Sequence, residues 1–551
     1  MSDRPRFTVL GKFISILLVA GLVTLGVYMI QRGGTDTDAG PGEAASSADE
    51  TEVAELKVEV PKLSPPAPFQ LKDNTIPIEI SEYAGYAGLI AANGGLEPSE
   101  NSYFFKNHGF KVRLTMSEDE DWSELNEGKL AGSVTTVDVL AAYGRQLHVV
   151  VPAQIGYSRG ADGVVVRSDI KRINQLKGKT IATAQFTEVD FFIRYLAQEA
   201  GLPINPLGSL DAAPHPDRLN LVYTEEGFGA GDLFLNDINS GRNRLAGAVT
   251  WEPKVSEVVE GSGGQAHVLT TNRNLLIVAD VLILHRGFAQ EHPKIVEGLV
   301  MGLLEGNRMV RDRPDQYLDV VGRAFKWSRE DTRSELTTVH LSNLPENLAF
   351  FSGSIDSAGS FGGIYQSAVL AYGSDLIKDP PDSGRFTDLS ALQAAERTGA
   401  FKGQEVAIVP IRSGSRASVE ADPLLSKDIR FLFEPNLATL DLSNRENIGN
   451  LEAIKRLVQV SPGSTLLLRG HVDNARVEDF RRQGGEAFLR TQALRAVELS
   501  KNRAAEIRRL LIERHGIDGK RIEIVGRGWE EPAGPDSDLN RRVEVQWFTV
   551  E

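Results

Sequence analysis

The side chains that most often perform covalent chemistry are scarce in this sequence. It has no cysteine, so disulfides, thiol catalysis, iron–sulfur clusters and cysteine-bound zinc are excluded. Nine histidines are present, but no G-x-S-x-G or H-E-x-x-H pattern and no P-loop motif occurs. The glycine-rich run Glu226–Gly231 lacks the lysine and hydroxyl residue of a phosphate-binding loop, and we interpret it as a surface loop. We predict no cofactor, no metal and no enzyme; acids brought together by the fold are the remaining route to catalysis.

The overall charge narrows the choice of partners. A formal net charge of −15 and a pI near 5.3 oppose a nucleic-acid partner, which requires a basic face to displace counterions. The hydrophobic fraction of 41% is sufficient for folded cores. At roughly 100–200 residues per domain, 551 residues predict two or three domains.

The N-terminal segment is predicted to anchor the chain in a membrane. An uncharged, apolar run extends from Phe13 to Ile30, close to the minimum length of a transmembrane helix. Arg4, Arg6 and Lys12 precede it and acidic residues follow it, which places the N-terminal end in the cytoplasm and exports the rest, so residues 1–32 are predicted to be a cytoplasmic tip and the transmembrane anchor. A cleaved signal peptide is the alternative, although no small-residue cleavage site ends the run. We expect a single-pass inner-membrane protein whose bulk lies in the periplasm.

The next two segments differ sharply in composition. Residues 33–75 are rich in Gly, Ala, Ser, Asp, Glu and Pro, which predicts a flexible linker. Residues 76–379 alternate short apolar runs with helical periodicities, which predicts an α/β domain with mainly parallel sheets covered on both faces.

The order of segments in this central part resembles type II periplasmic solute-binding proteins, especially the group for nitrate, sulfonates and pyrimidine precursors. The strongest local match is Ile173–Ala182, an exposed turn followed by a buried strand. Other matching segments are Ser81–Tyr86, Leu125–Asp138, Gly160–Arg167 and Ala248–Pro253. The resemblance implies two α/β lobes that close on a ligand held beyond the carboxyl ends of strands.

In that fold, four loops would face the ligand. The candidate ligand-binding residues are Tyr83, Tyr86, Thr135, Thr136, Asp138, Thr187, Glu188, Asp190, Trp251 and Glu252. Carboxylates in three of these loops would repel sulfonate or phosphate and would favour an amine or a cationic ring. For each residue, helix capping or core packing is the alternative interpretation.

A third pattern follows a connector over residues 380–425. Residues 426–551 predict strands and helices in alternation and carry four short motifs in order: Gly470–Asp473, Leu499–Ala504, Gly526–Gly528 and Asn540–Glu544. These motifs resemble those of OmpA-like peptidoglycan-binding domains, which implies a small α/β domain that holds the cell wall.

The resemblance also implies site residues. In the family, the aspartate of the first motif and the arginine of the second hold diaminopimelate in the peptide stem, which places those roles on Asp473 and Arg503. The chemistry is consistent, because a carboxylate accepts from the ammonium of diaminopimelate and a guanidinium pairs with its carboxylate. Asn474, Asn540 and Arg541 are further candidates, although Asn540 and Arg541 could instead stabilise the last strand.

The C-terminal segment departs from the family pattern in three places. Val472 replaces a threonine, and Ala496 stands where an asparagine is usual. The stretch between Asp473 and Leu499 is longer than usual, with the extra residues within Ala475–Arg490. They could form a lid beside the site or displace it.

Together these features predict a membrane-anchored periplasmic protein that binds peptidoglycan through its C-terminal domain and a small solute through its central domain, as a sensor or with a membrane transporter or signalling partner. The alternative is an envelope tether whose central domain is an interaction scaffold without a ligand.

Overall fold

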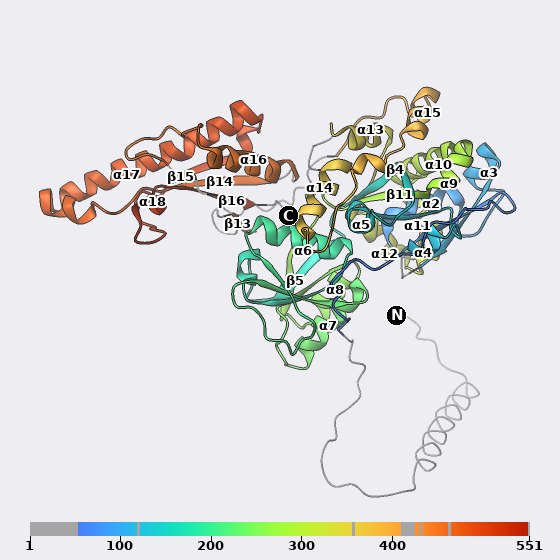
Figure 1. Cartoon of the computed structure of the whole chain (residues 1–551), viewed down its shortest axis with the longest axis horizontal. Coiled ribbons are helices and arrows are strands. Elements are labelled where there is room, and N and C mark those ends of the chain that lie inside the picture. The colour runs from blue at the N-terminus through green and yellow to red at the C-terminus, as the bar shows by residue number, and fades with distance from the viewer. Residues whose placement is uncertain are drawn as a thin grey trace, which may run out of the picture. The chain divides into compact units, whose positions relative to one another are not determined.

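A computed structural model describes residues 53–117, 122–354, 359–408, 425–427, 429, 431, 433–460 and 464–548 (Figure 1). The predicted anchor, Phe13–Ile30, lies outside these residues. Within them, no helix combines the length and the apolar character needed to cross a bilayer.

Two six-stranded sheets form the centre of the body. The first has the order β12-β4-β11-β3-β1-β2. Its strands are β1 (Thr75–Ile80), β2 (Lys111–Met116), β3 (Gly132–Thr136), β4 (Val149–Ser158), β11 (Ala279–His285) and β12 (Val339–Leu341). Strands β3, β4 and β11 are buried along their whole length, as expected for strands covered on both faces.

The second sheet has the order β10-β5-β9-β6-β8-β7. Its strands are β5 (Asp162–Arg167), β6 (Thr180–Ala184), β7 (Ile204–Pro206), β8 (Leu219–Thr224), β9 (Gly247–Trp251) and β10 (Ala266–Thr271). In each sheet three consecutive strand–helix units pair in parallel, and a strand arriving from the other sheet pairs antiparallel.

The sheets are therefore mixed rather than mainly parallel, which corrects the prediction. The chain crosses between the sheets from β4 to β5 and returns from β10 to β11. Each strand that enters a sheet from a crossing runs against its neighbours: β11 pairs antiparallel with β3 and β4, and β5 pairs antiparallel with β9 and β10. At the edge of the first sheet, β12 also pairs antiparallel with β4. Apolar runs in the sequence show that a strand is buried but not which way it runs.

Helices cover both sheets. Those associated with the second sheet are α6 (Glu188–Glu199), α7 (Gly227–Asn239) and α8 (Lys254–Gly261). The remaining helices of the body are α2 (Ala87–Asn93), α3 (Tyr103–His108), α4 (Trp122–Asn126), α5 (Val137–Tyr143), α9 (Arg286–Glu291), α10 (Pro293–Asp312), α11 (Leu318–Phe325), α12 (Arg329–Glu335), α13 (Leu344–Ser352), α14 (Phe361–Tyr372) and α15 (Ser390–Thr398).

Segments on either side of the predicted central domain also belong to the body. In the predicted connector, Phe386 is fully buried and its carbonyl accepts from Val151 N at 2.7 Å, while α15 packs against α10. In the predicted linker, residues 53–67 form an extended strap, hereafter the N-terminal strap. Ala54 N donates to Tyr223 O in the second sheet. Ala67 N donates to Asn126 O in the first lobe, the part of the body built on the first sheet. The body thus begins before residue 76 and continues beyond residue 379.

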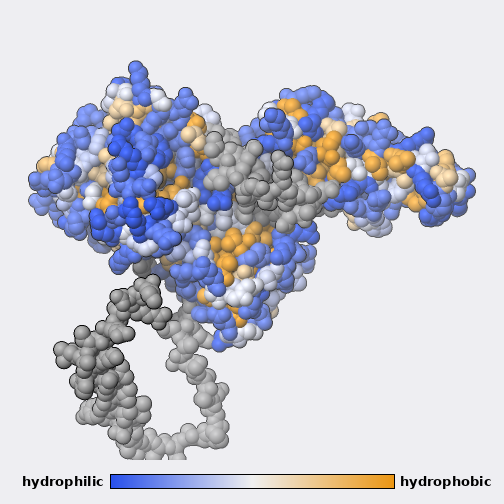
Figure 2. Space-filling model, turned by 180° about the vertical axis from the view of Figure 1, so that it is seen from behind, coloured by the Kyte–Doolittle hydropathy of each residue, from blue (hydrophilic) through white to orange (hydrophobic). Residues whose placement is uncertain are grey.

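The C-terminal domain, orange to red in Figure 1, is built on a four-stranded sheet of order β13-β16-β14-β15. Its elements are β13 (Leu425–Lys427), α16 (Arg445–Val460), β14 (Thr465–Gly470), α17 (Val477–His515), β15 (Ile522–Gly526), α18 (Ser537–Asn540) and β16 (Val543–Phe548). A space-filling view shows apolar patches on the surface of this domain (Figure 2). Among the described residues of this domain, the most exposed large apolar side chain is Leu494, at 73%.

Close helix packing in the first lobe depends on glycine. Gly302 of α10 faces the ring of Phe104, and a Cβ added at Gly306 would lie 1.9 Å from the carbonyl oxygen of Gly88 on α2. That separation is far inside van der Waals contact, so the two helices approach through bare backbone. Any side chain at Gly306 must push them apart.

We predict that Gly306→Ala lowers the free energy of unfolding of the body by about 1–3 kcal/mol, because the added methyl group overpacks the α10–α2 contact. Gly362→Ala on α14 is the matched control, since its Cβ would meet only Ser383 Oγ at 3.7 Å. It should be neutral or slightly stabilising through helix propensity. Denaturant unfolding of both variants measures the difference; equal stability would contradict the packing argument.

Candidate functional site

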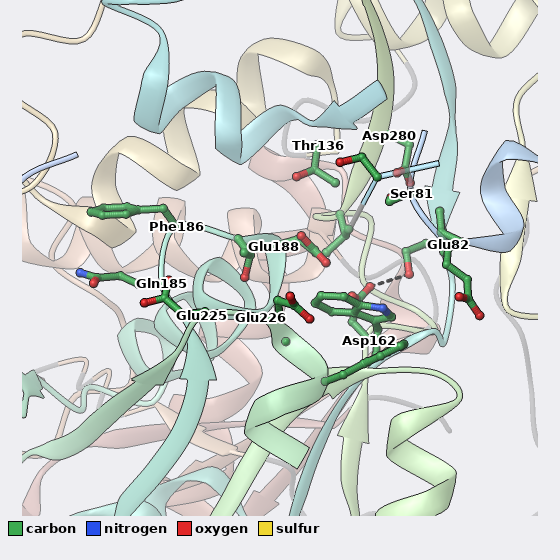
Figure 3. Close-up of a pocket in the computed structure, with 18 of the residues that line it drawn as sticks. Ser81, Glu82, Thr136, Asp162, Gln185, Phe186, Glu188, Glu225, Glu226 and Asp280 are labelled. Carbon is green, nitrogen blue, oxygen red and sulfur yellow. Dashed lines mark hydrogen bonds between the residues drawn. The ribbon is translucent and has the colours of Figure 1, made fainter. Parts of the chain in front are cut away.

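A cleft of about 360 Å³ lies between the two sheets (Figure 3). Loops that follow β1, β3, β6, β8 and β9 contribute to it, together with the two crossings and the N-terminal strap. The lining residues are Lys57, Ser81, Glu82, Tyr83, Tyr86, Ser117, Trp122, Thr136, Tyr143, Ser158, Asp162, Gln185, Phe186, Thr187, Glu188, Glu225, Glu226, Gly227, Phe228, Trp251, Val278 and Asp280.

Hydrogen bonds between the two crossings join the sheets at the cleft. Asn272 Nδ2 donates to Asp162 Oδ2 at 2.5 Å, and Asn272 Oδ1 accepts from Gly160 N at 2.8 Å. Ser158 Oγ donates to the same oxygen of Asp162, and Ser158 N donates to Val278 O at 3.1 Å. One asparagine and one aspartate thus bind the outgoing chain to the returning chain.

Two buried carboxyl groups from these crossings face the cleft. Burial raises the pKa of Asp162 to about 6, against the opposing hydrogen bonds from Ser158 and Asn272. Burial also holds the pKa of Asp280 well above its usual range. The hydrogen bond from Tyr86 Oη, at 3.0 Å, opposes that shift, while the charge of nearby Asp162 adds to it. The described lining residues place no cation beside either carboxyl group.

Six of the ten residues predicted for the central site lie at the cleft. They are Tyr83, Tyr86, Thr136, Thr187, Glu188 and Trp251. Trp251 packs against Phe228 with ring centroids 5.2 Å apart, and Tyr83 meets Tyr86 edge to face at 5.3 Å.

The other four predicted residues lie elsewhere. Thr135 is buried within β3, where alternation turns it away from its neighbour Thr136. Asp190 pairs with Arg194 Nε at 2.7 Å and accepts from Phe186 N, so it stabilises the start of α6. Glu252 accepts from Ser256 N at 3.0 Å at the start of α8. Asp190 and Glu252 therefore have the helix-capping role that we gave, from the sequence, as the alternative to ligand contact.

Asp138 does not line the cleft; it lies behind it, in the first turn of α5. It is fully buried, and a hydrogen bond with the side chain of the lining residue Thr136 opposes the effect of burial on its pKa. Burial raises the pKa of Asp138 to about 7.

Several cleft residues escaped the sequence prediction. The missed carboxylates are Glu82, Asp162, Glu225, Glu226 and Asp280, and the missed cation is Lys57. A signal existed for Asp162, because it begins an apolar strand that follows a polar turn, whereas Asp280 is a single acid within a longer apolar run. The sequence contains no such signal for Lys57, since this residue lies in a segment with the composition of a linker.

In the C-terminal domain, three of the five predicted residues converge. Asp473 follows β14, and its Oδ2 lies 3.8 Å from Arg541 Nη1. Burial, helped by the charge of Arg541, lowers the pKa of Arg503 to about 10, and the charge of Asp473 opposes this shift. The side chains of Asp473 and Arg541 are 27% and 16% exposed, so both reach solvent.

Arg503, by contrast, is completely buried. Its Nε donates to Leu437 O at 3.0 Å, and its two terminal nitrogens donate to His471 O and Glu434 O, each at 3.2 Å. The guanidinium carbon lies 5.2 Å from the ring of Phe433. Arg503 therefore ties α17 to two backbone segments, which sequence motifs could not reveal.

Asn540 and Asn474 differ in their surroundings. Asn540 is buried, accepts from Ala533 N at 2.6 Å and donates to Gly534 O at 2.8 Å, so it closes the loop before β16. Asn474 is exposed beside Asp473.

The extra residues after Asp473 are helical. They form the first part of α17, which is interrupted at Gly484 and at Gly485, whose φ is 65°. Phe480 from this part stacks on Trp529 with centroids 6.0 Å apart. Since Gly528, beside Trp529, accepts from Val472 N, the inserted segment lies next to the Asp473 loop without separating Asp473 from Arg541.

Comparison with known proteins identifies one part of the chain by sequence. Residues 432–546 match the OmpA family, so the C-terminal domain is an OmpA domain. A search of curated proteins gave no match.

Among solved structures, similarity falls on the central body. The chain is similar to the ligand-binding component of an ABC-type import system from Staphylococcus aureus, at 16% identity and a TM-score of 0.42, covering 59% of this chain and 99% of that one. It is also similar to the periplasmic aliphatic sulphonate-binding protein SsuA from Escherichia coli, at 15% identity and a TM-score of 0.43, covering 57% and 97%. The nitrate-binding protein NrtA from Synechocystis has 13% identity and a TM-score of 0.41, covering 59% and 89%.

The raised pKa of the buried Asp138 predicts that the stability of the folded protein depends on pH. Its raised pKa means that the folded state binds the proton more tightly than the unfolded state does, so the folded state loses stability as pH rises from about 4 to about 7. Asp138→Asn remains neutral throughout. We predict that it raises the free energy of unfolding relative to wild type at pH 7.5, and that this gain shrinks by on the order of 2 kcal/mol at pH 5.

Thermal and denaturant unfolding at the two pH values measure this effect, with the surface variant Asp375→Asn as control. A stability difference for Asp138→Asn that is the same at both pH values would contradict a raised pKa.

Proposed function

We propose that the protein is a bacterial cell-envelope protein that holds peptidoglycan with its C-terminal domain and a small solute in its central cleft. The observation that carries the first part is the OmpA match over residues 432–546, together with Asp473 and Arg541 at the surface and Arg503 behind them. We further propose that Phe13–Ile30 anchors the chain in the inner membrane and that the rest lies in the periplasm.

The C-terminal residues fit the zwitterionic end of diaminopimelate. The Asp473 carboxylate accepts from its ammonium group, and the partly exposed Arg541 guanidinium pairs with its carboxylate. The buried Arg503 donates to three backbone carbonyls, so it does not contact the ligand directly. It contributes a fixed positive charge behind Asp473 and Arg541. Each contact is modest, but a wall polymer repeats the same stem many times, so rebinding retains the protein.

The central cleft supports solute binding over a purely structural role. A scaffold would fill the space between its lobes with apolar side chains. Here a hollow of about 360 Å³ receives hydroxyl, carboxylate and aromatic groups from both sheets. Concave sites with a few convergent polar groups are typical of ligand-binding proteins. A protein fixed to the wall in this way could sense a solute or deliver it to a membrane partner.

We predict that Asp473→Asn weakens retention by purified diaminopimelate-type peptidoglycan about tenfold, because one charge-assisted hydrogen bond is lost. Co-sedimentation of the purified chain with peptidoglycan measures it. The matched control is Glu523→Gln, which neutralises an exposed carboxylate on β15. Indistinguishable sedimentation of the two variants would remove Asp473 from the site, and loss of binding in both would show that net charge alone is responsible.

A further inference from the structure

We propose that the ligand of the central cleft is an organic cation, an amine or quaternary ammonium compound whose positive charge is held among carboxylates and aromatic rings. This inference rests on the proposed solute-binding function of the same cleft and names the class of solute.

The first argument is charge. The described lining residues include six carboxyl groups, Glu82, Asp162, Glu188, Glu225, Glu226 and Asp280, and one basic side chain, Lys57. An anion entering this cleft would meet a field of the wrong sign, strengthened by the low-dielectric walls. A cation supplies the positive charge that the lining lacks.

The second argument is the nature of the rings between the acids. Trp251 and Phe228 form one aromatic pair, and Tyr83 and Tyr86 form another. The faces of such rings attract ammonium groups through their quadrupoles, and methylated ammonium groups favour rings because water solvates them poorly. Lys254 Nζ already lies over the Phe228 ring, 5.8 Å from its centroid, so this ring has a cation as a neighbour in the protein itself.

The third argument is the hydroxyl group at one end of the cleft. Thr136 is 6% exposed and lines the cleft, and its side chain forms a hydrogen bond with the carboxyl group of Asp138. Because this bond engages one side of the hydroxyl group, its oxygen keeps a lone pair that can accept from a ligand donor. Figure 3 places Thr136 at the same end of the cleft as Ser81 and Asp280.

The basic side chain of the cleft, Lys57, pairs with one of its carboxylates. Its Nζ lies 3.5 Å from Glu225 Oε2, and its backbone is fixed by two hydrogen bonds with the Gln185 side chain, at 2.9 and 2.7 Å. The N-terminal strap thus presents an ammonium group to the acidic lining. This internal cation competes with an external one for Glu225.

Calorimetric titration of the purified full chain tests the proposal with three probes. Choline is the cation, 3,3-dimethyl-1-butanol is its uncharged isostere, and ethanesulfonate is the anion. We expect choline to bind and the other two to bind at least tenfold more weakly. Benzylamine, with benzyl alcohol as its uncharged counterpart, repeats the comparison for a primary amine carrying a ring.

Variants separate the contributions. Glu188→Gln should weaken binding of the cations several-fold, whereas Glu396→Gln on α15, outside the cleft, should leave it unchanged. Lys57→Gln should strengthen cation binding about fivefold, the factor that corresponds to one partly exposed ion pair.

Each outcome has a distinct meaning. If ethanesulfonate binds and both cations do not, the cation proposal is overturned and solute binding stands. If neutral isosteres bind as tightly as the cations, shape rather than charge selects the ligand and the proposal is again overturned. If no probe binds wild type or Lys57→Gln, the proposal fails together with the solute-binding function of the cleft.

Discussion

The central body depends on the hydrogen bonds that join its two crossings. Asn272 reaches both Asp162 and Gly160, so the strand that leaves the first sheet and the strand that returns to it are fixed to each other. Every antiparallel pairing in the two sheets starts from these crossings. The same contacts set Asp162 and Asp280 beside the cleft, because each is an early residue of a strand that follows a crossing.

Burial of charge has opposite results in the two domains. In the cleft, acids are buried without cations beside them, which raises the pKa of both Asp162 and Asp280, so that an external positive charge would stabilise their ionised forms. In the C-terminal domain, Arg503 is buried but satisfied by three backbone carbonyls and an aromatic ring. The first arrangement is typical of a site and the second of a structural element.

Much of this organisation could be predicted from the sequence, and the limits have physical causes. Apolar runs located the strands, and loops at strand ends located Tyr83, Tyr86, Thr136, Thr187, Glu188 and Trp251 at the cleft. Periodicity could not give strand direction, so the mixed sheets were missed. Nor could it separate a helix cap such as Asp190 from a ligand contact, because both functions place an acid at the same position. The N-terminal strap was interpreted as linker, since a segment held by backbone hydrogen bonds requires no apolar pattern. A sequence motif drew attention to Arg503, but its complete burial depends on contacts with the 434–437 segment, which no motif describes.

The N-terminal strap connects the two sheets of the body on the side of the cleft that Lys57 lines. Because its hydrogen bonds engage Tyr223 and Gln185 at one sheet and Gln146 and Asn126 at the other, it acts as a tie across the opening. Any hinge motion that changes the spacing of the lobes must slide or release one end of this tie. The spacing of the lobes and the hydrogen bonds of the strap are therefore coupled, since a change in one must be accommodated by the other.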